Sequence, residues 1–225
     1  MVGMNLWCLG ALEPAERELR GFLEGEGAYS PSAPLHLFCF AGTLVDRGAL
    51  EEAYEVVSRT IAAWQARGLG MYEGQGRGVL AGVLCRRGEY AAAERAARGA
   101  RELLGFLPLE HMAATATLAA ALLGQGRAAE ALIAAQTAMQ QQEALSAFGF
   151  RGAATRLVHI EALEAMGDHA QACKALSAAR DRLRNQAAKI GDPAVRRGFL
   201  EDLPENARTL ALAGQWLGEG DTAVS

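Results

Sequence analysis

The sequence predicts an all-α protein, a right-handed α-α superhelix of about five helical hairpins, and two observations carry that prediction. Glycines recur at intervals of 38 to 41 residues, and each is followed five positions later by an alanine. A leucine stands four residues before each of these glycines, which are Gly10, Gly48, Gly88, Gly126 and Gly167. Periods of this size are typical of helical solenoids, in which neighbouring units bury each other's apolar faces.

Each unit is interpreted as a helical hairpin that turns at its glycine. In the fourth unit, apolar residues recur three and four positions apart on both sides of Gly126, as expected of two amphipathic helices. Glycine has no Cβ and therefore adopts the left-handed backbone that ends a helix. The alanine five residues later, here Ala131, is expected where the two helices cross, because a larger side chain there would overpack by about 1 to 3 kcal/mol.

The same pattern, followed along the chain, predicts twelve helices. We expect them at residues 3–9, 12–25, 35–47, 50–67, 71–87, 90–104, 109–124, 128–145, 149–166, 169–190, 193–202 and 204–218. A loop rich in Gly, Ser and Pro is expected at 25–34. Residues 1–190 are expected to form the repeats, and residues 191–225 a C-terminal cap with a short tail.

Both ends of the array leave alternatives open. The first helix of the first unit is short, which suits either a piece of a longer solenoid or a natural N-terminal helix that acts as a cap. At the other end, Pro193 and Pro204 suit the first turns of two short helices. Their apolar residues would cover the last repeat; these are Phe199, Leu200, Leu210, Leu212, Trp216 and Leu217. Alternatively, Arg196, Arg197 and Arg208 form a site for an acidic partner.

Composition and motifs exclude several classes of function. The net charge of −4 and the pI near 5.7 argue against a nucleic-acid-binding face. No signal peptide and no apolar run of membrane-spanning length is found, so we expect a cytoplasmic protein that does not enter a membrane. The four cysteines form no CxxC pair and are expected to be reduced and packed. No catalytic, metal-binding or cofactor-binding motif stands out, so an enzyme is not expected.

The spacing of leucine, glycine and alanine resembles the tetratricopeptide repeat. The period is longer than the usual 34 residues, as in the helical sensor regions of bacterial signal-transduction ATPases. The C-terminal segment, through Asp192-Pro193, Arg196-Arg197-Gly198-Phe199-Leu200 and Leu203-Pro204-Glu205-Asn206, is similar to the end of the repeats in large bacterial serine/threonine protein kinases. These resemblances imply a non-catalytic interaction or sensor module of bacterial signal transduction. The module would be the C-terminal part of such a regulator or a stand-alone repeat protein.

The tetratricopeptide resemblance also implies a concave groove, lined by the first helix of each hairpin at positions 13, 10, 6 and 3 before the glycine. In this chain these positions are Leu35, Phe38, Gly42, Val45, Gln75, Gly78, Gly82, Cys85, Ala113, Ala116, Ala120, Leu123, Ala154, Leu157, Glu161 and Glu164. Because they are mostly small and apolar, we expect a protein or peptide partner, an apolar helix above all. A small molecule in the groove, or self-association as a homodimer, are the alternatives. The same residues could instead only pack neighbouring helices.

Overall fold

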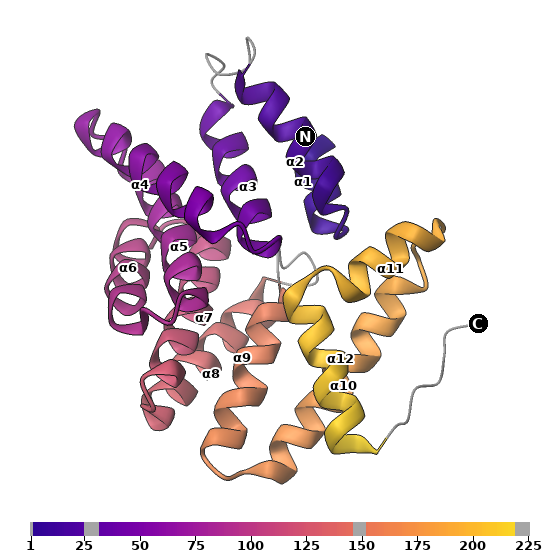
Figure 1. Cartoon of the computed structure of the whole chain (residues 1–225). Helices are drawn as coiled ribbons and strands as arrows, with labels where there is room; N and C mark the ends of the chain where they lie inside the picture. Colours follow the sequence, from indigo (N-terminus) through magenta and orange to yellow (C-terminus); the bar gives the residue numbers. More distant parts are fainter. Residues whose placement is uncertain (1, 25–31, 146–151, 219–225) are drawn as a thin grey trace.

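The computed structural model describes residues 2–24, 32–145 and 152–218, and within these ranges the chain is all-α with twelve helices (Figure 1). The helices are α1 (Val2–Cys8), α2 (Leu12–Glu24), α3 (Ala33–Asp46), α4 (Leu50–Ala66), α5 (Gly70–Arg86), α6 (Tyr90–Leu103), α7 (Pro108–Gly124), α8 (Ala128–Ala144), α9 (Gly152–Ala165), α10 (His169–Ala187), α11 (Pro193–Glu201) and α12 (Pro204–Leu217). They follow the predicted ranges within three residues, and most of the predicted loop lies outside the described residues.

The predicted turn at each repeated glycine is confirmed. All five glycines have φ between 73° and 81°, in the left-handed region. The N–H of the following residue donates to the carbonyl of the leucine four residues before the glycine, as from Ala49 to Leu44 at 2.9 Å, and this bond recurs in all five units. It is the hydrogen bond that defines a Schellman-type helix end. The repeated leucine and glycine therefore mark one local structure, the end of the first helix of a hairpin.

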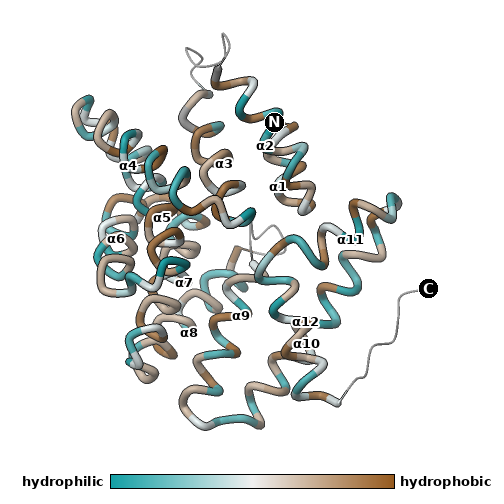
Figure 2. The backbone as a smooth tube through the Cα atoms, viewed as in Figure 1, coloured by the Kyte–Doolittle hydropathy of each residue, from teal (hydrophilic) through white to brown (hydrophobic). Residues whose placement is uncertain are grey.

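The alanine five positions after each glycine is fully buried in every unit. Ala15, Ala53, Ala93, Ala131 and Ala172 are each 0% exposed. At these points the two helices of a hairpin pack without room for a larger side chain. In Figure 2, hydrophobic and hydrophilic residues alternate along the helices, as expected of elements that bury one face. The repeat is thus a packing unit as well as a sequence pattern.

Neighbouring hairpins stack on each other along the chain. The first helices of successive units, α3, α5, α7 and α9, contact one another in that order. Ion pairs join the second helix of one unit to the turn or helix of the next, including Arg20 with Glu52 at 2.8 Å and Arg127 with Glu94 at 2.8 Å. None of the described helices is both long and apolar enough to cross a membrane.

The two ends of the array meet, so that the helices form a closed ring (Figure 1). Leu203 belongs to the apolar cluster that joins the first two units, with Trp7 and Phe40, and Phe199 packs against the same cluster. A Cβ placed on Gly10 would lie 2.4 Å from the carbonyl oxygen of Gly198 in α11, so the first turn touches α11 through its backbone. Phe199, which was expected to cover the last repeat, packs against this first cluster, while α11 as a whole also contacts α10 of the last repeat.

Helix α12 connects α11 to the last repeat. It packs on α9 and α10, with Leu212, Trp216 and Leu217 against the apolar cluster of the last unit. The buried side chain of Asn206 donates to the carbonyl of Phe199 at 2.7 Å and so ties α12 to α11. The C-terminal helices thus connect the last repeat to the first unit.

Candidate functional site

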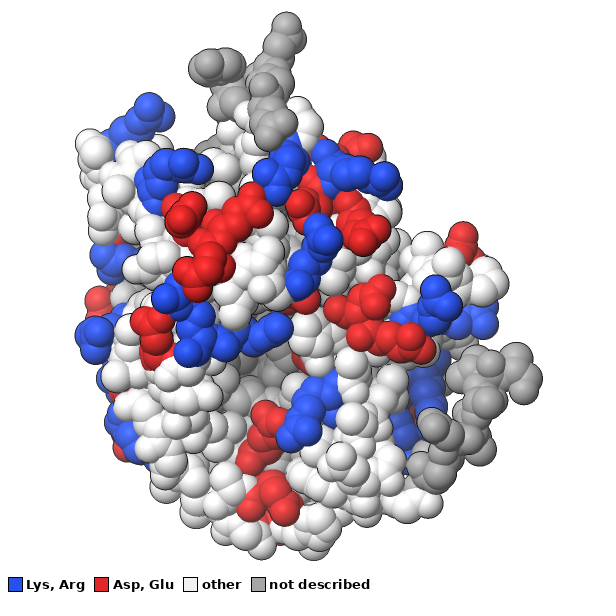
Figure 3. Space-filling model, in the orientation of Figure 1, with Lys and Arg blue, Asp and Glu red and all other residues white. Residues whose placement is uncertain are grey.

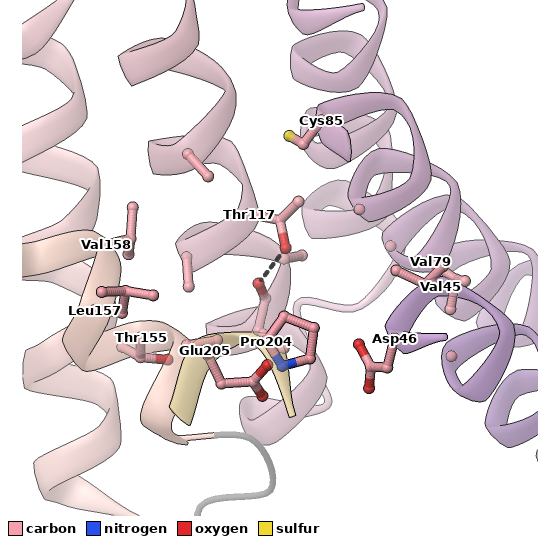
Figure 4. Close-up of a pocket in the computed structure, with 18 of the residues that line it drawn as sticks. Val45, Asp46, Val79, Cys85, Thr117, Thr155, Leu157, Val158, Pro204 and Glu205 are labelled. Carbon is pink, nitrogen blue, oxygen red and sulfur yellow. Dashed lines mark hydrogen bonds between the residues drawn. The ribbon is translucent and has the colours of Figure 1, made fainter. Parts of the chain in front are cut away.

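A cavity of about 480 Å³ lies inside the ring, at the hollow near the centre of Figure 3. Its walls come from the first helices of the second to fifth units, from Trp7 of α1, and from the beginning of α12. Figure 4 shows these walls together: Val45 and Val79 on one side, Leu157 and Val158 on the other, and Pro204 and Glu205 from α12 between them. The cavity therefore depends on every unit and on the closure of the ring.

Small residues on the inner helices leave this space unfilled. A Cβ placed on Gly82 would meet no atom within 4 Å, and one on Gly78 would meet only the Cβ of Ala100 at 4.0 Å. On α7, Ala116 and Ala120 line the same space. Because the walls carry no long side chains at these positions, the interior remains open although the helices behind it are tightly packed.

Trp7 lines the cavity and packs on a glycine of α3. A Cβ on Gly42 would lie 2.2 Å from the indole ring, so the ring lies directly on the backbone of α3. The indole N–H donates to Asp46 at 2.7 Å, and the ring packs edge-on against Phe38 with centroids 6.0 Å apart. Trp7 is 2% exposed, so this contact orients it firmly against the cavity wall.

Charged side chains gather around the apolar wall. The acidic lining residues are Asp46, Glu110, Glu161 and Glu205, and the basic ones are Arg86 and Arg208. Arg208 Nε lies 3.3 Å from Glu161 Oε1 and so pairs α12 with α9. Among uncharged polar groups, the Thr117 hydroxyl is occupied by the carbonyl of Ala113 at 3.0 Å (Figure 4). The lining thus combines an apolar interior with an excess of carboxylates.

The structure brings most of the predicted groove residues together in this cavity. Those that line it are Phe38, Gly42, Val45, Gln75, Gly78, Gly82, Cys85, Ala113, Ala116, Ala120, Ala154, Leu157 and Glu161. Leu35, Leu123 and Glu164 lie outside. Leu35 is exposed near the start of α3, Leu123 packs between α7 and α8, and Glu164 binds His169 at 2.7 Å. Whether the cavity binds a ligand stays a prediction.

Sequence reasoning missed several lining residues: some, such as Val79, Thr117 and Val158, lie beside predicted positions on the same helices, and others come from α1 and α12. Trp7 lies three positions before Gly10, which is the same register that places Val45 and Cys85 on the inner face. Applying the register to the short first unit could have found it. Pro204 and Glu205 carry no such signal, because α12 reaches the cavity only through the packing of the whole ring.

The three arginines proposed for an acidic partner have separate surroundings. Arg196 donates to the carbonyl of Ile190 at 3.0 and 2.9 Å, and so holds the start of α11 against the end of α10. Arg208 faces the cavity and pairs with Glu161. Arg197 is exposed on α11. Arg196 therefore has a role within the fold that explains its presence without a partner.

The cysteines and histidines differ in their environments. Burial raises the pKa of Cys85, in the cavity wall, to about 11 and that of Cys39 to about 12. Cys8 is exposed, so the expectation that all four cysteines are packed is wrong for this one. Burial lowers the pKa of His159, against a smaller opposing effect of Glu143. Within the described ranges, no three His, Cys, Asp or Glu side chains are grouped as metal ligands would be.

Comparison with known proteins supports the fold. No family model matches the sequence, and none of the curated proteins is significantly similar to it. Among solved structures, the chain is similar to the crystal structure of the nearly identical TPR-like repeats of a Podosopora anserina protein assigned as a kinesin light chain. The two are 18% identical, the match covers 82% of this chain and 89% of that one, and the TM-score is 0.54. The chain is therefore a TPR-like helical repeat array.

Proposed function

We propose that this chain is a non-catalytic binding module that holds an apolar segment of a partner protein against its inner face. The observation that supports this most directly is the cavity, to which the inner helices of four consecutive units and α12 all contribute lining residues. An array that only packed its helices together would need no such open, largely apolar interior. The carboxylates around the wall favour a partner segment that carries basic residues beside its apolar ones.

The closed ring limits how a partner enters. A helix with its side chains is about 10–12 Å across, whereas the cavity holds about 480 Å³ and is bounded by α12. Side chains or a short extended segment fit that space more readily than the whole apolar helix that the sequence favoured. A complete helix requires α11 and α12 to move away from the first unit. The proposal is therefore insertion of apolar side chains from a partner into the cavity.

A matched pair of variants on α3 tests the proposal. Phe38→Glu places a charge in the cavity wall, and Leu35→Glu places the same charge one turn earlier on the same helix, outside the cavity. Proteins that bind the wild-type module in pull-down should be kept by Leu35→Glu and lost by Phe38→Glu. Both variants must retain the helical circular dichroism of the wild type. Equal capture by Phe38→Glu and the wild type would contradict the proposal.

A second candidate is a small apolar ligand, and the size and apolar walls of the cavity favour it. The volume of about 480 Å³ lies within the range of small-molecule sites. Native mass spectrometry of the purified protein tests this candidate. A bound mass that is present in the wild type and Leu35→Glu but absent in Phe38→Glu would support it, and an adduct-free wild type that binds protein partners would favour the first candidate.

The biological context that we propose is cytoplasmic signal transduction, as part of a bacterial kinase- or ATPase-type regulator. Its support is the resemblance of the segment from Asp192 to Asn206 to the repeats of such proteins. In the structure this segment forms α11 and the first turn of α12, and Asp192 caps α11 by accepting from the N–H groups of Ala194 and Val195. Sequencing the gene on both sides of the coding region tests the context, since a kinase or ATPase domain in the same reading frame is expected.

A further inference from the structure

A carboxylate, an imidazole and a thiol lie in a row at the turn between α9 and α10. Glu164 Oε2 lies 2.7 Å from His169 Nδ1, and His169 Nε2 lies 3.3 Å from Cys173 Sγ. His169 and Cys173 share one helix face because they are four residues apart. Glu164 comes from the last turn of α9 and reaches His169 because the chain reverses at Gly167. The group thus depends on the hairpin turn of the fifth unit.

The order of the three groups determines where the proton lies. An ionised carboxylate only accepts hydrogen bonds, so Nδ1 of His169 carries the hydrogen that binds Glu164. In the neutral imidazole, Nε2 is then the acceptor, and it faces the thiol of Cys173. A nucleophile, a base and a group that orients the base are the parts of an activated nucleophile.

The surroundings suit a reaction with a dissolved reagent. Cys173 is half-buried, and the His169 side chain is 56% exposed, so small molecules reach both. Trp216 of α12 packs its ring against the imidazole, with centroids 5.5 Å apart, and restricts its rotation. The three side chains do not surround a common point as metal ligands would, since His169 lies between the other two.

We propose that Cys173 is a reactive thiol that is oxidised by hydroperoxides, with His169 as its base and Glu164 as the positioning residue. His169 takes the thiol proton, and the sulfur attacks the outer oxygen of the peroxide. The S–O bond forms as the O–O bond breaks, and the leaving oxygen takes the proton from the imidazolium. Cysteine becomes a sulfenic acid, oxidised by two electrons, while the hydroperoxide is reduced to an alcohol or water.

The chain supplies its own reference thiols. Cys8 is the exposed reference, and burial raises the pKa of Cys39 and Cys85 and so disfavours their thiolates. The protein is treated with hydrogen peroxide in the presence of dimedone, which traps sulfenic acids, and each cysteine is quantified by peptide mass spectrometry. We expect Cys173 to be labelled at least about tenfold faster than Cys8. In urea, where the fold is lost, the two rates should become equal.

Three variants test whether His169 acts as the base of Cys173 or only packs beside it. His169→Gln should lower the labelling of Cys173 to the rate of Cys8, and Glu164→Gln should lower it by a smaller factor. Glu51→Gln, at an exposed position of α4, is the control, because it replaces a carboxylate by the same amide away from the fifth unit and should leave the rate unchanged. The proposal is overturned if Cys173 reacts no faster than Cys8, or if His169→Gln labels as fast as the wild type. Unchanged circular dichroism in each variant excludes unfolding as the cause.

Discussion

The first unit and the middle units build their contacts from different side chains. At the start of the array, Trp7 of the first unit packs with Phe40 and Leu44 of the second unit and with Leu203 and Phe199 from the C-terminal helices. In the middle units, α6 and α8 present alanines at their fully buried positions; these are Ala93, Ala97, Ala100, Ala131, Ala135 and Ala138. Small residues let consecutive helices approach closely, whereas large ones span the space between elements that are distant in sequence. The comparison separates stacking within the array from closure of the ring.

The largest effect is expected in the first unit, for Trp7→Ala. We expect a loss of about 3–5 kcal/mol in the free energy of unfolding, because the change leaves a cavity beside Phe38 and removes the donor to Asp46. Trp7→Phe keeps most of the apolar contact and should cost about 1–3 kcal/mol. Denaturant unfolding followed by circular dichroism measures both. If Trp7→Ala were as stable as the wild type, the contacts of Trp7 would contribute nothing to the closure of the ring.

Gly10→Ala against Gly48→Ala measures the closure itself. The two glycines have nearly equal φ, 76° and 79°, so each alanine meets the same cost of about 1–2 kcal/mol for a left-handed backbone. A Cβ at Gly48 meets no atom within 4 Å, but one at Gly10 meets the backbone of Gly198. Gly10→Ala should therefore be the less stable variant and should lose hydrogen-exchange protection in α11. Equal stabilities and equal exchange would mean that the ends do not meet in solution.

Overpacking tests the middle units. Ala97 in α6 is fully buried between Ala81, Leu118 and Ala131. Ala97→Leu should destabilise the protein by about 1–3 kcal/mol, because the added methyl groups push neighbouring helices apart. Ala91→Leu adds the same volume at an exposed position of the same helix and should change the stability by no more than about 0.5 kcal/mol. Similar melting temperatures for the two variants would contradict close packing in the middle of the array.

The smallest effect is a pH dependence that belongs to the last units. Burial lowers the folded-state pKa of His159. As the pH falls below about 6.5, the unfolded chain binds a proton that the folded chain does not, so the stability decreases until the pH passes the folded-state pKa. His159→Gln removes that proton uptake. Its free energy of unfolding should therefore fall less than that of the wild type between about pH 7 and about pH 5.5. An identical decrease in both proteins would assign the acid sensitivity to other groups.

Much of the inner face was predictable because the register follows from the glycines. Phe38, Gln75 and Leu157 lie in three different units, yet all line the cavity at the expected position. The same register fails at Leu123, whose side chain packs into the clusters between α7 and neighbouring helices. A position three residues before the glycine lies at the edge of the inner face, where a small rotation of the helix decides between groove and core.

The group of Glu164, His169 and Cys173 is likewise predictable from the sequence only in part. The spacing of His169 and Cys173 is visible in the sequence and places them on one helix face. The approach of Glu164 is not, because it depends on how the chain reverses between α9 and α10. The orientation of the imidazole depends further on Trp216, which lies 47 positions after His169 in the sequence.

The sequence by itself determined the hairpins of this protein, their number and their turns. Each hairpin turn needs a glycine with a left-handed backbone and, five residues later, a fully buried alanine. Because both lie close together in the chain, they appear in the sequence as a repeated local pattern. Only the tertiary structure decided that Gly10 meets Gly198, that the beginning of α12 lines the cavity, and that Trp7 lines it as well. These contacts depend on the rotation that accumulates from unit to unit, which no single repeat encodes.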